Sequence, residues 1–177
     1  MSRFNNPFER GTTRSATDRP HLLGQRCYFD NVVANTGNGP TKVTDGREVE
    51  AIVVKNDSGG TLAAKKAVTW KAGYTGTRVG GVTSGASQRV AGIVDPFLTS
   101  TVADGEQFLL IVKGPTTVLA NDGSITAGTG LVSQAAGRAG GYAANGDSDD
   151  ALSYFGTADA ASSAQDDDVA ATIDCRY

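Results

Sequence analysis

The side chains best suited to catalysis are few in this chain and are not grouped. The sequence holds one histidine, His21, and two cysteines, Cys27 and Cys175, which lie near opposite ends. No HExxH, GxSxG or phosphate-loop pattern occurs, so the usual hydrolases and nucleotide enzymes would lack essential parts here. The glycine-rich stretches 79–85 and 128–137 are interpreted as hairpin turns. We therefore predict a protein with no catalytic residues, no enzymatic activity and no cofactor.

The cysteines and the acidic runs are the remaining candidates for covalent and metal chemistry. Cys27 and Cys175 belong to no CxxC or Cys/His cluster, which favours buried free thiols, although a bridge between them stays open. The acidic runs 147–150 and 166–168 could gather Ca²⁺ through oxygen ligands, but their spacing differs from that of an EF-hand loop. Carboxylates beside turn residues commonly cap backbone amides. Three aspartates are in this position: Asp95, Asp104 and Asp122. We predict no metal site.

Charge is distributed unevenly along the chain. Residues 1–26 contain five arginines against Glu9 and Asp18, a net charge of +3, while the whole chain carries -3, so the remainder carries -6. The acidic remainder lacks a Lys/Arg face interleaved with aromatic residues, which argues against a nucleic-acid partner. An acidic protein is the better partner for the basic segment.

Residues 1–26 are too polar to form a core of their own. Pro7 and Pro20 interrupt them, and their apolar side chains are isolated. We expect either a disordered tail or an extended arm that becomes ordered against a partner, with aromatic rings filling pockets and arginines pairing with carboxylates. The residues predicted to make these contacts are Arg3, Phe4, Phe8, Arg10, Arg14 and Arg19. The predicted organisation is this arm, residues 1–26, and one folded domain, residues 27–177.

The rest of the chain has the pattern of β-strands separated by turns. Residues 107–113 (QFLLIVK) form the most apolar run and are bounded by Asp-Gly and Gly-Pro turns, which predicts a buried central strand. Residues 48–55 and 169–175 alternate between two faces. Further strands are predicted at 27–33, 67–70, 90–95, 116–120, 128–132 and 153–156, with a loop or hairpin at 73–87. About eight to ten short strands without a sustained amphipathic helix predict an all-β domain, a compact barrel or a sandwich.

No segment is suited to export or to crossing a membrane. The first 20 residues contain four arginines and no apolar stretch, unlike a secretory signal. Nothing later approaches the roughly 18 consecutive apolar residues of a membrane span. We expect synthesis in the cytoplasm and no membrane partner.

Several segments, taken in order, resemble a known family. They are EVEAIVVKNDSGGTLAAKKAVTW (48–70), VAGIVDPF (90–97), DGEQFLLIVKGPTTVLA (104–120), TAGTGLV (126–132) and, after an acidic loop, VAATIDCRY (169–177). This order resembles that of the small β-rich decoration (cement) proteins of tailed-phage capsids, over residues 47–177. The most specific piece is the GE-x-F-apolar-V-x-GP arrangement from Gly105 to Pro115. The N-terminal arm is longer than in the shortest members, which leaves the mode of attachment open.

The resemblance implies a compact β-barrel or β-tulip that binds across junctions between major capsid protein subunits and stabilises the phage head. It implies a homo-oligomer, a trimer rather than a dimer, on the outer surface of the virion, made in the host cytoplasm. The six arm residues would then contact the capsid or a neighbouring subunit. The rival interpretation is a carbohydrate-binding or adhesin-like β-sandwich on the virion surface, which requires a surface cluster of aromatic residues. The available aromatic residues are Trp70, Tyr74, Tyr142 and Tyr154.

Overall fold

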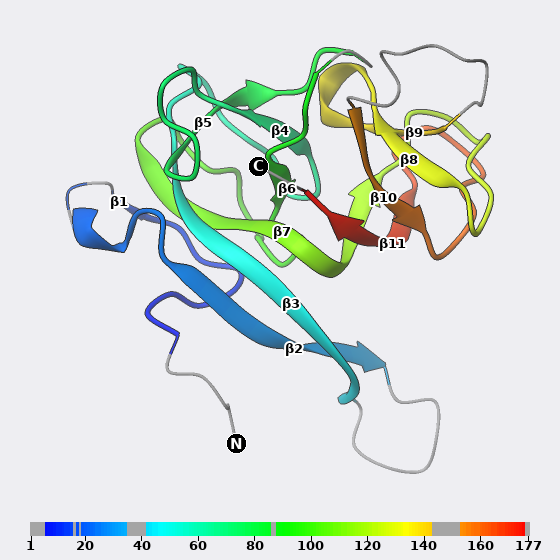
Figure 1. The fold of residues 1–177 in the computed structure, drawn as a ribbon, viewed down its shortest axis with the longest axis horizontal. Helices are drawn as coiled ribbons and strands as arrows, with labels where there is room; N and C mark the ends of the chain where they lie inside the picture. The colour runs from blue at the N-terminus through cyan, green and yellow to red at the C-terminus, as the bar shows by residue number, and fades with distance from the viewer. Residues whose placement is uncertain are drawn as a thin grey trace.

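Nearly every element of the fold is a β-strand. The computed structural model describes residues 6–15, 17, 19–34, 42–85, 88–142 and 153–175 (Figure 1). The strands are β1 (Arg14–Ser15), β2 (Arg26–Ala34), β3 (Lys42–Asn56), β4 (Ala67–Trp70), β5 (Arg78–Val82), β6 (Gly92–Val94), β7 (Glu106–Leu119), β8 (Gly130–Ser133), β9 (Ala139–Gly141), β10 (Tyr154–Ala158) and β11 (Asp168–Asp174). Two short 3-10 helices are η1 (Pro20–Leu22) and η2 (Ala135–Gly137). No helix within these ranges is long and apolar enough to cross a membrane. The all-β prediction is confirmed.

The strands form one large sheet of 11 strands and not a clean barrel. Strands β3, β5, β4, β6 and β7 pair in that order, and β7 pairs back onto β3, so these five close a ring. On the other side, β7 is followed in the sheet by β11, β10, β8 and β9 (Figure 1). β3 has 15 residues and β7 has 14, so the two strands that connect the parts are longer than the sequence predicted.

β7 changes its partner at Gly114. Residues 107–113 pair with β3, and residues 113–119 pair with β11. Gly114 has a φ of +94°, and a Cβ atom at this position would collide with the carbonyl oxygen of Glu48. Glycine tolerates both conditions, because it has no side chain. The Gly-Pro step therefore redirects the chain without ending the strand, which is why the two strands predicted on either side of it are one.

Both faces of β7 are covered by hydrophobic cores. Leu109 and Ile111 belong to a first core, whereas Phe108, Leu110 and Val112 belong to a second. All five are at most 2% exposed. Successive side chains of a strand point to opposite faces, so a continuous apolar run fits a strand that is buried on both sides. The prediction of a buried central strand in this run is confirmed, and β3 alternates between the same two cores.

The start of the described chain lies on the body instead of extending away from it. We call residues 6–15 the N-terminal strap. Phe8 of the strap is fully buried in the first core, which also contains Leu22. Asn6 donates a hydrogen bond from Nδ2 to the carbonyl oxygen of Tyr28 at 2.6 Å and accepts one from its N–H at 3.1 Å. Phe8 therefore anchors the polar segment to the core of the body instead of filling a partner's pocket, because burial of one aromatic ring removes a large apolar area from water.

Cys27 and Cys175 are both buried free thiols, which decides the alternative left open by the sequence. Burial raises the pKa of both thiols; the charge of Asp174 raises that of Cys175 further, and a backbone hydrogen bond from Phe8 partly offsets the rise at Cys27. A raised pKa keeps a thiol protonated, so neither cysteine is suited to act as a nucleophile.

Candidate functional site

Strand β2 and the first part of β3 form a hairpin that projects from the rest of the sheet (Figure 1). β3 pairs with β7 only from Glu50 onward, so residues 42–49 are held by β2. The register of the hairpin shifts between Asp30 and Val32, and such irregularities bend a two-stranded ribbon. Within the described ranges, β2 pairs with β3 alone. Side-chain contacts at the root of the hairpin add to this backbone pairing.

Arg47 braces the root of the hairpin against the body. Its Nε donates to Oδ2 of Asp45 at 2.7 Å, and its Nη1 lies 3.4 Å from Oδ2 of Asp159 and 3.3 Å from Oγ1 of Thr172. Asn31 on β2 also donates to Oδ2 of Asp45, at 2.7 Å. The pKa of Asp45 is lowered to about 2, first by the backbone N–H of Arg47 and then by these side-chain bonds. One hydrogen-bond network thus links the hairpin to β11 and to the end of β10.

Acid should loosen this brace. The pKa of Asp45 in the fold, about 2, lies below its ordinary value of 3.8, so its stabilising effect is present above the ordinary value and is lost as pH falls toward 2. The pKa values of Asp122, Asp166 and Asp167 are lowered too. We expect the urea midpoint to fall between about pH 5 and about pH 2, and less steeply in Asp45→Asn. A carboxyl NMR titration in which Asp45 titrates at its ordinary value would contradict this network.

A groove of about 300 Å³ lies between the hairpin and the body. β2, β7, β11 and the turn after β6 contribute to its walls. Two exposed apolar side chains line it: Val32 on β2 is 45% exposed and Phe97 in the turn is 50% exposed. Lys65 and Asp168 also line it, and Nζ of Lys65 lies 2.8 and 2.7 Å from the two carboxylate oxygens. The groove thus combines exposed apolar side chains with charged groups that already pair with each other.

Phe97 is held in place by Arg10 of the strap. The guanidinium carbon of Arg10 lies 4.2 Å from the centre of the Phe97 ring, and Nη2 and Nε donate to Oδ1 of Asp95 at 3.0 and 3.2 Å. Asp95 is 1% exposed, and its Oδ2 accepts a hydrogen bond from the N–H of Gly11 at 2.6 Å. Burial lowers the pKa of Arg10, and the charge of Asp95 opposes that effect. Arg10 was expected to contact a partner; its guanidinium pairs with Asp95 of its own chain, and Arg10 also lines the groove, so contact with a partner stays a prediction for it.

The other predicted contact residues are in different environments. Phe8 is in the first core, and the guanidinium carbon of Arg14 lies 5.0 Å from the centre of its ring. Arg19 is exposed. Arg3 and Phe4 lie outside the described residues. The ring of Phe8 is covered by its own chain. For the other arm residues of this paragraph, contact with a partner stays a prediction: Arg3, Phe4, Arg14 and Arg19.

Neither Val32 nor Phe97 was predicted as a contact residue. Val32 belongs to a predicted strand, where one exposed valine gives no signal. Phe97 follows Pro96 in a turn, and an aromatic residue in a turn is a weak sign of exposure. The groove is assembled from strands that are far apart in the chain, so no local pattern could indicate it.

The aspartates predicted to cap turns do so. Oδ1 of Asp122 accepts a hydrogen bond from the N–H of Ser124 at 2.8 Å, and Oδ1 of Asp104 accepts one from Gly59 at 2.9 Å. Each member of the acidic run 166–168 is also engaged inside the fold: Asp166 by Arg138, Asp167 by the N–H groups of residues 163 and 164, and Asp168 by Lys65. Among the described residues, no group of three His, Cys, Asp or Glu side chains could hold a metal ion. The run 147–150 lies outside them.

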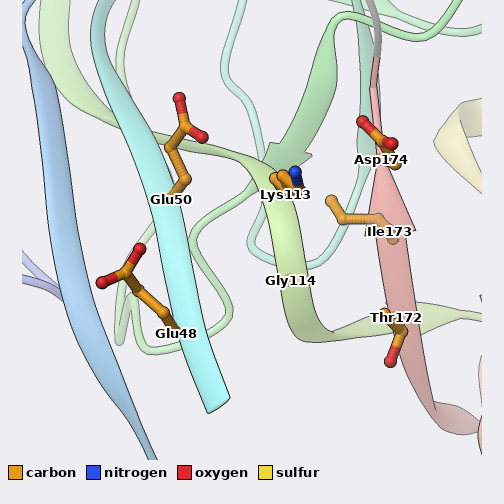
Figure 2. Close-up of a pocket in the computed structure, with 7 residues that line it drawn as sticks. All are labelled: Glu48, Glu50, Lys113, Gly114, Thr172, Ile173 and Asp174. Atoms are coloured by element: carbon orange, nitrogen blue, oxygen red, sulfur yellow. The ribbon is translucent and has the colours of Figure 1, made fainter.

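A second hollow, of about 360 Å³, lies where β7 changes its partner (Figure 2). Figure 2 shows Glu48 and Glu50 on β3 and Asp174 on β11, on either side of Lys113. Glu50 forms an ion pair with Arg26. The residues that line the hollow include no histidine and no cysteine. The hollow is therefore an ionic surface, in which three carboxylates lie around one ammonium group.

Two of the aromatic residues considered for glycan contact lie together. The ring centres of Tyr142 and Tyr154 are 6.5 Å apart, and the planes meet at 86°. Trp70 packs against the second core, and the guanidinium carbon of Arg78 lies 4.1 Å from the centre of the Tyr74 ring. Of the four aromatic residues available to the rival interpretation, Tyr142 and Tyr154 thus form a pair.

Comparisons with known proteins give little guidance. No protein-family model matches the chain, and no curated protein matches it. One solved structure with partial similarity is described as the head fiber gp8.5 N base in bacteriophage phi29. The match covers 70% of this chain and 92% of that chain, with 16% sequence identity and a TM-score of 0.47. Values this low establish neither a shared family nor a shared function.

Proposed function

We propose that this chain is a capsid decoration (cement) protein that binds the outer surface of a phage head at junctions between major capsid protein subunits and stabilises the head. The observation that carries the proposal is the groove beside the projecting hairpin, where Val32 and Phe97 are about half exposed. The sequence resemblance over residues 47–177 supports the same function. Such a protein acts by binding alone and needs no chemical step.

The groove has the composition of a docking surface. Aromatic side chains are frequent hot spots of protein interfaces, because covering one removes a large apolar area from water. Arg10 packs on the Phe97 ring, and Oδ1 of Asp95 accepts a hydrogen bond from the Phe97 N–H at 3.3 Å. A side chain that is positioned before binding loses less entropy on docking. The charged side chains Arg47 and Lys65, which line the groove, already pair with carboxylates of the same chain. The capsid therefore need not supply counter-charges for them.

Attachment to a repeating lattice suits a small protein. We propose a homo-oligomer, a trimer rather than a dimer, because several grooves that engage equivalent capsid sites raise avidity without a high affinity at each site. Arg3, Phe4, Arg14 and Arg19 remain candidate contacts to the capsid or to a neighbouring copy. Neither nucleic acid nor a membrane is proposed as a partner.

Phe97→Asp should release the protein from capsids. Phage heads that lack the decoration protein are incubated with the wild-type chain or a variant, and bound copies are measured after sedimentation. We expect Phe97→Asp and Val32→Asp to weaken binding by more than about tenfold, because each puts a charge where apolar surface must be covered. Val82→Asp is the matched control: Val82 on β5 is 38% exposed, lies outside the groove and should tolerate the change.

Two outcomes would count against these proposals in different ways. Equal occupancy of heads by wild type and Phe97→Asp, both shown to be folded by circular dichroism, would reject the groove as the docking surface. Failure of the wild-type chain to bind any phage head would reject the decoration function itself.

A further inference from the structure

Two exposed tyrosines meet over a glycine on the β8–β10 side of the sheet. Tyr154 on β10 is 50% exposed, and Tyr142, which follows β9, is 38% exposed. Their rings are in edge contact, with planes 86° apart. A Cβ atom at Gly130 on β8 would lie 2.8 Å from Cε2 of Tyr154 and 3.3 Å from Cβ of Tyr142. The Tyr154 ring thus rests against bare backbone, in space that any other residue at position 130 would occupy.

We infer that Tyr154 and Tyr142 form a binding platform for a neutral saccharide. A pyranose ring presents a face of C–H groups that packs against the electron-rich face of an aromatic ring, while its hydroxyl groups bond at the periphery. Tyr154 would be the floor of such a site, and Tyr142, which stands at a right angle to it, would be a wall.

One uncharged hydroxyl group contacts the platform, and two more belong to residues that precede Gly130 in the chain. The Tyr154 hydroxyl lies 3.3 Å from Oγ1 of Thr157, which is the residue opposite Gly130 in the β8–β10 ladder. Oγ1 of Thr129, next to Gly130 in the chain, lies 2.7 Å from Oγ1 of Thr126. Hydroxyl groups both donate and accept hydrogen bonds and can therefore match the hydroxyl groups of a sugar.

The surroundings favour a sugar over a protein as the ligand. A protein interface usually covers a continuous patch with several apolar anchors. The other large exposed apolar side chains of the described ranges belong to other elements: Val32, Tyr74, Val82 and Phe97. The platform is therefore two rings wide, which suits one or two sugar units. It is also separate from the groove, which β2, β7 and β11 form, so it does not depend on the proposed capsid attachment.

Tyr74 provides a matched control within the same chain. It is 44% exposed, close to the value for Tyr154, but the Arg78 guanidinium lies 4.1 Å from the centre of its ring. A face that an arginine covers is not open to a sugar ring. Replacement of Tyr74 thus removes an equally exposed tyrosine without touching the platform.

Saturation-transfer NMR with the full chain tests the inference. The probes are glucose, galactose, N-acetylglucosamine and their β-1,4-linked disaccharides, each at about 20 mM, because a single stacked sugar binds in the millimolar range. We expect transfer from at least one probe, a loss of more than about tenfold in affinity for Tyr154→Ala, a smaller loss for Tyr142→Ala and no change for Tyr74→Ala. Tyr154→Phe keeps the ring and should retain most of the binding.

Three results would overturn the inference. They are the absence of saturation transfer from every probe, sugar binding that survives Tyr154→Ala, and equal losses for Tyr154→Ala and Tyr74→Ala. If the NMR signals of Tyr154 shift on addition of phage heads but not on addition of sugar, the platform is a protein contact and the saccharide inference is wrong. Because circular dichroism reports the fold of each variant separately, a loss of binding by unfolding would be recognised.

Discussion

Replacement of Phe8 by alanine is expected to lower the free energy of unfolding by about 3–5 kcal/mol, the usual cost of removing a buried aromatic ring. The side chain is fully buried in the first core, in the same cluster as Leu22 and Cys27. Alanine would leave a cavity there, and the hydrogen-bonded pairing of β2 with β3 limits how far the walls can collapse into it. Urea denaturation followed by circular dichroism measures the change.

Two truncations separate the strap from the residues before it. Removal of residues 1–5 keeps Phe8, the Arg10–Asp95 pair and the pairing of β1 with β7, so the free energy of unfolding should stay within about 1 kcal/mol of wild type. Removal of residues 1–15 deletes all three and should destabilise the protein at least as much as Phe8→Ala. A truncation of residues 1–15 with full stability would show that the body folds without the strap, and would restore the interpretation of a free arm.

A carboxylate at position 110 or 111 should prevent folding. Leu110 and Ile111 are both 0% exposed, and their side chains belong to different cores. Burial of an unpaired carboxylate costs several kcal/mol, which is comparable with the whole stability of many domains, about 5–15 kcal/mol. Soluble yield and circular dichroism of Leu110→Asp and Ile111→Asp measure the effect. Val82→Asp, in which the new carboxylate stays in solvent, should fold normally.

The two substitutions test the two faces of β7 independently. A folded Leu110→Asp would mean that the second core is open to water at this point, and a folded Ile111→Asp would mean the same for the first core. Soluble, fully folded protein from both variants would refute the central position of β7.

Local pattern was enough to locate most of the strands. The run 107–113 is apolar at consecutive positions and is bounded by turns, and the structure buries it on both faces. The alternation after residue 168 is equally direct: Val169, Ala171, Ile173 and Cys175 are buried, and the residues between them are exposed. Both patterns are visible in the sequence because the side-chain period of a strand is a local property of the backbone.

Local pattern also misplaced features whose outcome depends on distant segments. The Gly-Pro step at 114–115 has the composition of a turn, yet β7 continues through it, because β11 takes up the pairing where β3 leaves. Phe8 stands alone in a polar segment, and its burial depends on a core to which distant strands, among them β2, β3 and β7, contribute. Arg10 finds its carboxylate 85 residues away, at Asp95.

The candidate site belongs entirely to the tertiary level. Its apolar residues, Val32 and Phe97, are 65 positions apart in the sequence. They line one groove because β2 lies beside the second half of β7 and the first half of β11. Composition and period thus determined that this protein is all-β, with a doubly buried central strand, whereas only the structure decided that its two thiols are free. Long-range strand pairing decided that its basic N-terminal segment is partly core. It also decided which side chains remain exposed, since exposure depends on what the rest of the chain covers.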